Sequence, residues 1–409
     1  MKTRNDLLIV KEGLEVIQLT DEEKYGSSHV YMEAQIFFPD SKRFVLHRAA
    51  TAHGVDRMDP EHRYLLCDIE NGCSLEPLTQ EIGVLGPAVS PDGRFFYYFN
   101  DETQVNGGRL ALKRIDFGNN RKKEIVTVID APLHETGTIP SRVYPLSTIS
   151  SDGKKIAVSA FLGDGEREKA PWGLLVFDIE KEEVSVALQG YTFGNMHPQY
   201  CRSRELEFNR DIMIQENHGN VFDRYGVRKT LVSGKGADIH VIRDDGSNFR
   251  TMPWGRDGRE FCTGHECWRG RSCWAIASVW YGDNKDVRLI ESVPVKGKKH
   301  TGLKIEGGMR NDLSMNFDNP GFGHFATDME GKLIVSDYFL KGIFLARLQE
   351  EGRMPAAGWM NIADSRSSGK KTGHIHPFLS PDGKKAFFNS DESGILQAYM
   401  ITGLENLKI

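Results

Sequence analysis

Short apolar stretches separated by tight-turn residues are the dominant pattern along the chain. The clearest copy lies at 379–391, where LSPDGKKAFFNSD places Pro-Asp-Gly between two apolar stretches. Asp-Gly provides the backbone angles that a hairpin turn needs, and the Val, Ile, Phe and Tyr residues that flank such turns favour strands. A helical period of apolar positions is almost absent. The pattern therefore predicts an all-β protein built from hairpins.

This turn recurs at a spacing of about 50 to 60 residues, which is the scale of a four-stranded propeller blade. Its copies, some of them weaker, lie at 37–46, 89–99, 149–159, 207–215, 267–278, 327–337 and 379–391. Seven copies predict a seven-bladed β-propeller that forms a single domain over residues 1–409. A pair of β-sandwiches would not explain the fixed period. We expect a strand near 14–20 to pair with the last strand, at 395–402, and so to close the ring.

Histidines recur at the starts of the predicted inner strands, which are the strands just before each turn. Of the 13 histidines in the chain, six lie at such starts: His29, His197, His265, His324, His374 and His376. In an extended strand, residues i and i+2 point to the same side, so His374 and His376 should present two imidazoles in one direction. We expect His324, from the neighbouring blade, to supply a third.

Three imidazoles at one rim predict a site for a borderline divalent ion such as Mn²⁺, Fe²⁺, Ni²⁺ or Zn²⁺. The alternative is that the His-x-His pair only caps a strand with polar side chains. The six cysteines include no CxxC pair, and we expect buried free thiols, with a zinc cluster of Cys262, Cys267 and Cys273 as the less favoured reading. No P-loop, GxSxG or dinucleotide-binding motif is present.

Charge and hydropathy exclude several other classes of protein. The net charge of −5 gives no reason to expect a nucleic-acid partner, and an acidic ligand would need a local cluster of cations. No apolar stretch approaches membrane-spanning length, and charged residues interrupt the first 19 residues, so we read no signal peptide. We therefore expect a cytoplasmic protein with no membrane partner, and we leave open whether it is a homo-oligomer.

Several segments of the chain are similar to one known family. They are GLEVIQLT at 13–20, MHPQY at 196–200, DDGSN at 244–248, TGHECW at 263–268, GHFATDMEGKLIVSD at 323–337 and GHIHPFLSPDGKKAFFNSD at 373–391. With these segments the chain resembles the oligogalacturonate lyase family (polysaccharide lyase family 22) over nearly its full length. The resemblance implies a seven-bladed propeller that cleaves short uronate oligosaccharides by β-elimination, with bound Mn²⁺.

The resemblance also implies roles for particular residues. His324, His374 and His376 fall on metal ligands, and His265 falls on the general base, for which Lys371 and Tyr200 are the alternatives. Two positions depart from the family pattern: Lys371 replaces a glutamine ligand, and Asp238 replaces an arginine.

The missing arginine makes other cations candidates for its role. These candidates are Arg202, Arg204, Arg228 and Lys371, and we predict that Arg202 is catalytic. We further predict that the substrate contacts His197, Tyr200, Arg204 and Lys371.

The chemistry of β-elimination suits this set of residues. The proton at C5 of a uronate is weakly acidic because the neighbouring carboxylate is already negative, so a bound cation must neutralise the carboxylate. An imidazole of ordinary pKa, about 6.5, suits proton removal near neutral pH. Two other functions remain open: a non-catalytic propeller of the TolB type that binds a protein partner, and a related propeller enzyme with an altered substrate.

Overall fold

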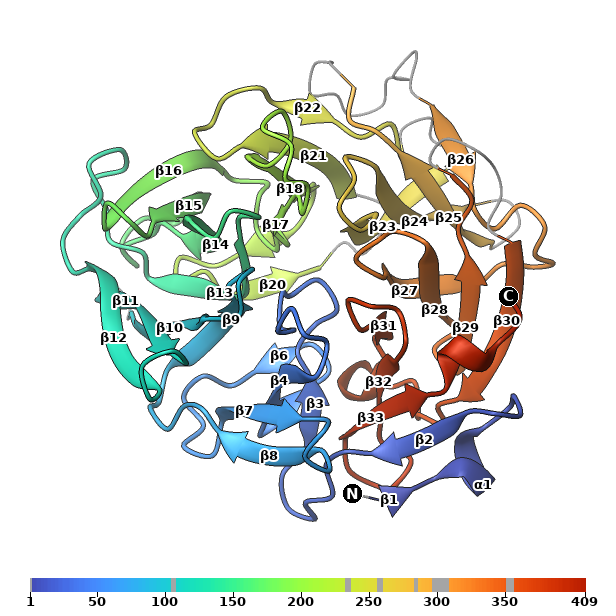
Figure 1. The fold of residues 1–409 in the computed structure, drawn as a ribbon. Helices are drawn as coiled ribbons and strands as arrows, with labels where there is room; N and C mark the ends of the chain where they lie inside the picture. Colours follow the sequence, from blue (N-terminus) through green and yellow to red (C-terminus); the bar gives the residue numbers. More distant parts are fainter. Residues whose placement is uncertain are drawn as a thin grey trace. The chain divides into compact units, whose positions relative to one another are not determined.

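The computed structural model describes residues 2–103, 108–231, 237–255, 260–282, 286–295, 309–350 and 357–409. These residues form antiparallel sheets joined by loops, with one short α-helix, α1 (Asn5–Leu8), and two 3-10 turns, η1 (Lys371–Gly373) and η2 (Leu404–Asn406) (Figure 1). The predicted all-β class is therefore confirmed. No helix in the described ranges is long and apolar enough to cross a membrane.

The chain divides into two compact units. The first unit comprises Met1–Gln80, His265–Val293 and Gly308–Ile409, and the second comprises Glu81–Gly264 and Pro294–Gly307. The boundary between them falls within strand β23 (Glu260–Trp268). The predicted single domain over residues 1–409 and the predicted count of seven blades stay predictions.

The first unit contains a sheet in the order β1-β2-β33-β32-β31, two sheets of four strands, β3-β4-β7-β8 and β27-β28-β29-β30, the small hairpin β5-β6, and the run β24-β25-β26. The bounds are β1 (Lys2–Thr3), β2 (Glu15–Gln18), β3 (Ser27–His29), β4 (Arg43–Arg48), β5 (Ala50–Thr51), β6 (Gly54–Val55), β7 (Arg63–Asp68), β8 (Ser74–Pro77), β24 (Ala275–Tyr281), β25 (Val287–Ser292), β26 (Arg310–Asp312), β27 (Phe322–Thr327), β28 (Leu333–Tyr338), β29 (Gly342–Arg347), β30 (Ala357–Asp364), β31 (Phe378–Leu379), β32 (Ala386–Ser390) and β33 (Gln397–Thr402).

The second unit contains the four-stranded sheets β9-β10-β11-β12 and β13-β14-β15-β16, the run β17-β18-β21 with β22 beside β21, and the hairpin β19-β20. The bounds are β9 (Val84–Val89), β10 (Phe95–Glu102), β11 (Arg109–Asp116), β12 (Lys122–Ile129), β13 (Arg142–Ile149), β14 (Lys155–Phe161), β15 (Trp172–Asp178), β16 (Glu183–Gly190), β17 (Gln199–Tyr200), β18 (Asp211–Asn217), β19 (Val221–Phe222), β20 (Arg228–Thr230), β21 (Ala237–Arg243) and β22 (Arg250–Thr251).

The N-terminal strand β2 pairs with the C-terminal strand β33, as the sequence predicts. Glu15 lies opposite Thr402 and Gln18 opposite Tyr399 in an antiparallel register. This pairing joins the two ends of the chain in one sheet of the first unit, and the prediction for 14–20 and 395–402 is confirmed.

The recurring Ser-x-Asp-Gly turn has the same geometry at each of its clearest copies. At Ser380 the hydroxyl donates to the Asp382 carboxylate, while the Gly383 amide donates to the Ser380 carbonyl at 2.9 Å. Gly383 has a φ of +69°, in the left-handed region that glycine adopts without steric cost. The equivalent glycines, Gly93 and Gly153, have φ of +71° and +74°. The sequence repeat therefore encodes one hairpin turn used repeatedly.

The cysteines behave as the sequence predicts. All six are free thiols, and five of them are buried. Among the described residues, no cysteine belongs to a group that could hold a metal ion. The prediction of buried free thiols is confirmed for five of the six cysteines, and Cys273 is a free thiol that is half-buried.

His29, one of the six histidines at predicted inner-strand starts, lies in the core. It is fully buried, its Nε2 is 2.9 Å from the Tyr399 carbonyl, and its ring lies edge-on to Phe378 and Phe387. Burial lowers the pKa of His29 to about 4. An imidazole in the unfolded chain titrates near pH 6.5, so the unfolded state binds more protons between these two values.

We expect the folded protein to lose stability in acid because of His29. The contribution of its neutral imidazole is complete above about pH 6.5 and falls as the pH drops to about 4, a change of roughly 3 kcal/mol. Denaturant unfolding of the wild type and of His29→Gln at pH 7.5 and pH 5 measures this effect, since the glutamine amide does not titrate. An identical pH dependence in both proteins would contradict the prediction.

Candidate metal centre

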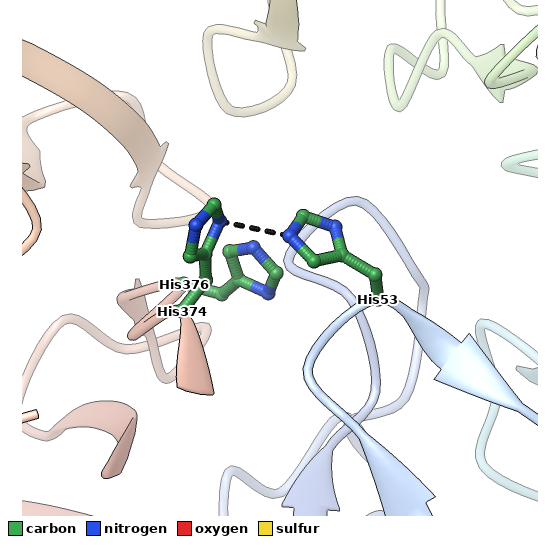
Figure 2. A group of neighbouring side chains, drawn as sticks. All are labelled: His53, His374 and His376. Atoms are coloured by element: carbon green, nitrogen blue, oxygen red, sulfur yellow. Dashed lines mark hydrogen bonds between the residues drawn. The ribbon is translucent and has the colours of Figure 1, made fainter. Parts of the chain in front are cut away.

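Five histidines of the first unit lie together: His53, His265, His324, His374 and His376. His53 is at the tip of the β5-β6 hairpin, His265 is in β23 and His324 is in β27. His374 and His376 lie between η1 and β31. Figure 2 shows His53 facing the His374 and His376 pair from a separate loop. A backbone hydrogen bond of 3.2 Å from the Ala52 amide to the Thr372 carbonyl joins the two loops.

The rings of these histidines are in close contact. His53 Nε2 is 2.8 Å from His374 Nδ1, the contact dashed in Figure 2. The ring centroids of His324 and His376 are 4.2 Å apart, those of His53 and His376 are 4.6 Å apart, and those of His265 and His324 are 4.1 Å apart. Ligand nitrogens of His53, His374 and His376 all lie within 4.8 Å of one another. A single ion therefore has several imidazole donors within reach.

The backbone of the His-x-His pair does not have the predicted extended conformation. His376 has a φ of +41°, and β31 begins only at Phe378, so the pair does not lie in an extended strand. Left-handed backbone at a non-glycine residue costs on the order of 1–3 kcal/mol and concentrates at functional sites. Ile375, between the two histidines, is fully buried in the core and anchors the loop. The strand-alternation argument was wrong, although both imidazoles do face the cluster.

Asp337, on β28, fixes the orientation of His324. Its Oδ2 is 2.7 Å from His324 Nδ1, and its Oδ1 accepts from the Gly323 and His324 amides. Because Asp337 accepts the Nδ1 proton, Nε2 of His324 carries the lone pair. A carboxylate behind a histidine is the usual outer partner of a metal-binding imidazole.

Three imidazole nitrogens of this cluster are buried and have no hydrogen-bond partner among the described residues: Nε2 of His324, and both Nδ1 and Nε2 of His376. A buried polar atom left unpaired costs about 1–3 kcal/mol. A neutral imidazole has one nitrogen with a lone pair, so His324 and His376 each offer one donor atom to a ligand that accepts lone pairs. The donor set suits a borderline divalent ion.

The electrostatics of the cluster favour neutral imidazoles. Burial lowers the pKa of His324 to about 3, and it lowers the pKa of His376 well below its ordinary value. Burial also lowers the pKa of His374, and the ammonium of Lys371 adds to this effect. Burial raises the pKa of Asp337 to about 6. Neutral imidazoles have the lone pairs that a metal ion requires.

Lys371 is exposed and opens η1 just before His374. Its charge acts on His374 and also on His53, so it lies near the cluster. The predicted placement of His265, His324, His374, His376 and Lys371 in one region is thus seen within the first unit.

The remaining predicted site residues belong to the second unit. His197 Nε2 is 2.7 Å from the Tyr144 hydroxyl, near the start of β13. Tyr200 is buried in the core, its hydroxyl donates to Asp244 at 3.4 Å, and burial raises its pKa well above its ordinary value. A buried, weakly acidic phenol suits neither a general base nor a substrate contact.

Arg202 and Arg204 lie at the opposite end of β13 from His197. They flank Ser203, whose carbonyl accepts a hydrogen bond from Ser151 in the turn that follows β13. Arg204 also lines a pocket of about 620 Å³ with residues of that turn. The predicted grouping of both arginines with His197 at strand starts was wrong, because the chain has run through β17 before it reaches them.

Sequence reasoning missed His53 and Asp337. His53 lies at a hairpin tip outside the repeated turn, so the strand-start pattern does not select it. Asp337 ends the segment TDMEGKLIVSD, and only its distance from His324 reveals its role.

No family model and no curated protein matches the sequence. Among solved structures, an oligogalacturonate lyase in complex with manganese has a TM-score of 0.69 at 19% identity, covering 98% of this chain and 95% of that chain. An oligogalacturonate lyase from Vibrio parahaemolyticus has a TM-score of 0.69 at 16% identity, covering 100% and 97%. The β-propeller domain of the Trilobed protease from Pyrococcus furiosus has a TM-score of 0.50 at 11% identity, covering 93% and 94%.

At such low identities these similarities establish the fold. The chain is a β-propeller, as the sequence predicts, and its fold is similar to that of oligogalacturonate lyases. One compact unit of this propeller carries a cluster of histidines that could hold a metal ion.

Proposed function

We propose that this protein is a metal-dependent lyase that cleaves short oligogalacturonate-like oligosaccharides by β-elimination. The observation that carries the proposal is the set of buried, unpartnered imidazole nitrogens of His324 and His376 within the histidine cluster. The similarity in fold to an oligogalacturonate lyase in complex with manganese supports it. The partner would be an acidic oligosaccharide.

His324, His374 and His376, joined by His53, would hold the divalent ion, which we propose to be Mn²⁺. When bound, the ion supplies positive charge that neutralises the uronate carboxylate and stabilises the carbanion formed beside it. The Asp337 carboxylate accepts a hydrogen bond from Nδ1–H of His324, so that Nε2, which carries the lone pair, faces the ligand. His53 supplies a fourth donor in a chain where Lys371 cannot act as the amide ligand of the family.

His265 is the proposed base. Its ring lies 4.1 Å from that of His324, and its side chain is half-buried, so an imidazole nitrogen can meet a substrate beside the cluster. It takes the C5 proton, the electron pair forms the C4–C5 double bond, and the C4–O bond breaks. The departing oxygen gains a proton from solvent or a neighbouring acid, and no water is added across the bond.

Lys371 supplies a cation for the acidic substrate. Its side chain is exposed near the cluster, where an ammonium can pair with a uronate carboxylate. In a protein of net charge −5, such a local cation helps to draw an anionic sugar to the site. A cytoplasmic location stays a prediction, and whether the protein is a homo-oligomer stays open.

The test is to incubate the Mn²⁺-loaded protein with oligogalacturonates of defined short length. We expect ultraviolet absorbance to rise as the unsaturated uronate product forms, and the rise to stop after chelation and resume when Mn²⁺ is restored. Oligosaccharides with the carboxylates reduced to alcohols are the matched control and should give no product. Absence of product from a panel of uronide linkages would overturn the proposal and favour a non-catalytic binding propeller.

A further inference from the structure

A second group of metal-binding side chains lies in the second unit, on the paired strands β18 and β21. Glu216 is directly opposite Asp238 in the antiparallel register, and His240 is two residues beyond Asp238. Residues two apart in a strand share a face, so these three side chains project from the same side of the sheet. His218, two residues beyond Glu216, follows the end of β18 and contacts the same group.

The ligand atoms of this group are close enough to share one ion. Those of Glu216, Asp238 and His240 all lie within 4.8 Å of one another. His240 Nε2 is 3.0 Å from Glu216 Oε2, and His218 Nε2 is 3.0 Å from Asp238 Oδ2. Two ligand atoms that bind one ion at ~2.1 Å, at right angles, are ~3.0 Å apart. The side chains therefore need little movement to bind.

Outer partners hold two of these side chains in place. His240 Nδ1 is 3.1 Å from the Thr251 hydroxyl, and the Thr192 hydroxyl donates to Glu216 Oε1. In the structure Nε2–H of His240 donates to Glu216 Oε2, and the Thr251 hydroxyl can accept the Nδ1 proton in the tautomer whose Nε2 lone pair would bind an ion. Because the Thr192 hydroxyl donates to Oε1 of Glu216, Oε2 is the oxygen that faces the group. This arrangement, in which the second atom of each ligand is hydrogen-bonded from outside, is the one found around metal sites.

Positive charge would stabilise the buried carboxylates of this group, which hydrogen-bond to His240 and His218. Glu216 and His240 are fully buried and Asp238 is 7% exposed, so two carboxylates lie opposite each other away from water. Like charges directly opposite on paired strands destabilise a sheet, and buried carboxylates require pairing or a metal. The side chain of His218 is 27% exposed and forms the solvent-facing side of the group. An ion can enter there.

We propose that Glu216, Asp238 and His240, with His218 at the entrance, form a second divalent-ion site. Two carboxylates and two imidazoles suit Mn²⁺, Fe²⁺ or Zn²⁺. The competing arrangement is a buried network in which protonated imidazoles pair with the carboxylates. The second site does not depend on the proposed lyase function, and it involves none of the histidines of the first unit.

The experiment uses the full chain with the first cluster disabled by His324→Ala and His376→Ala. We expect this protein to keep about one tightly bound divalent ion, measured by elemental analysis after dialysis against Mn²⁺. Adding Glu216→Gln and Asp238→Asn should weaken Mn²⁺ binding by about 100-fold or more, because two charged ligands are lost. Asp211→Asn is the control. Asp211 is also a buried carboxylate of β18, but it forms an ion pair with Arg250 and lies outside the group.

A measurement on unaltered ligands keeps the test decisive if the neutralised variant does not fold. In the protein with the first cluster disabled, stoichiometric Mn²⁺ should broaden the imidazole proton resonances of His218 and His240 and leave those of the exposed His134 sharp. Sharp signals from His218 and His240, or Mn²⁺ binding that Glu216→Gln and Asp238→Asn do not change, would overturn the second site.

Discussion

A protein carrying His324→Ala and His376→Ala should lose its first-unit metal ion and its lyase turnover together. The two substitutions remove the buried nitrogens that lack hydrogen-bond partners, and Asp337 then has no imidazole to orient. Loss of a cation that stabilises the carbanion is worth several kcal/mol, so turnover should fall by about 10³-fold or more. Metal content and product formation in parallel samples measure both effects.

The same cluster offers a readout that does not depend on activity. Without metal, His376→Leu should stabilise the protein by about 1–3 kcal/mol, because an apolar side chain replaces buried nitrogens that have no partner. Added Mn²⁺ should then raise the melting temperature of the wild type more than that of the variant. His134→Ala, an exposed histidine of the second unit, is the control. Unchanged metal content in the folded double-alanine variant would remove these residues from the metal site.

Replacing His265 should separate chemistry from metal binding. His265→Ala is expected to keep the fold and the metal but to lose about 10²- to 10⁴-fold in turnover, which is the usual contribution of a positioned base. Because its ring packs against His324, a structural role would instead appear as lost metal or a lower melting temperature. His265→Gln keeps the size of the side chain without a proton acceptor of suitable pKa and should behave like the alanine variant.

The positions of Lys371 and Tyr200 decide which of them could replace His265 as the candidate base. Near-wild-type turnover in a folded, metal-loaded His265→Ala protein would exclude this residue as the base. Lys371, exposed near the histidines, would then be the next candidate. Tyr200 would not, because it lies in the core and burial raises its pKa well above its ordinary value.

The sequence predicts the fold well because its repeat is a physical unit. Each Ser-x-Asp-Gly turn favours one hairpin. The number of residues between successive turns is the number that a four-stranded blade needs. The all-β propeller class can therefore be predicted without knowing which distant residues are in contact. The pairing of 14–20 with 395–402 is also predictable, because a ring needs its two ends to meet.

The site is predicted less completely, and the reasons differ between residues. His324, His374 and His376 follow from the strand-start pattern, but the backbone that orients His376 has a positive φ, which no alternation rule provides. His53 arrives on a hairpin whose loop is joined to η1 by a backbone hydrogen bond between Ala52 and Thr372, a tertiary contact with no sequence signal. The strand-start pattern also selects a histidine that does not belong to the site, because His29 is a core residue.

Closeness in sequence does not place Arg202 and Arg204 beside His197 in the structure. Arg202 and Arg204 are close to His197 in sequence, but β17 lies between them and carries the chain to the other end of the sheet. A strand rises about 3.3 Å per residue, so a few residues are enough to separate side chains that look adjacent in the sequence. This placement gives no support to the predicted catalytic role of Arg202 or to the predicted substrate contact of Arg204.

The central claim is that the histidine cluster holds a divalent ion that the elimination requires. Anomalous X-ray scattering at the manganese edge, from crystals of the active protein grown with Mn²⁺, tests this claim most directly. We predict a peak about 2.2 Å from imidazole nitrogens of His324, His374 and His376, with His53 as a further ligand. A crystal that forms product but shows no manganese peak at these histidines would contradict the account.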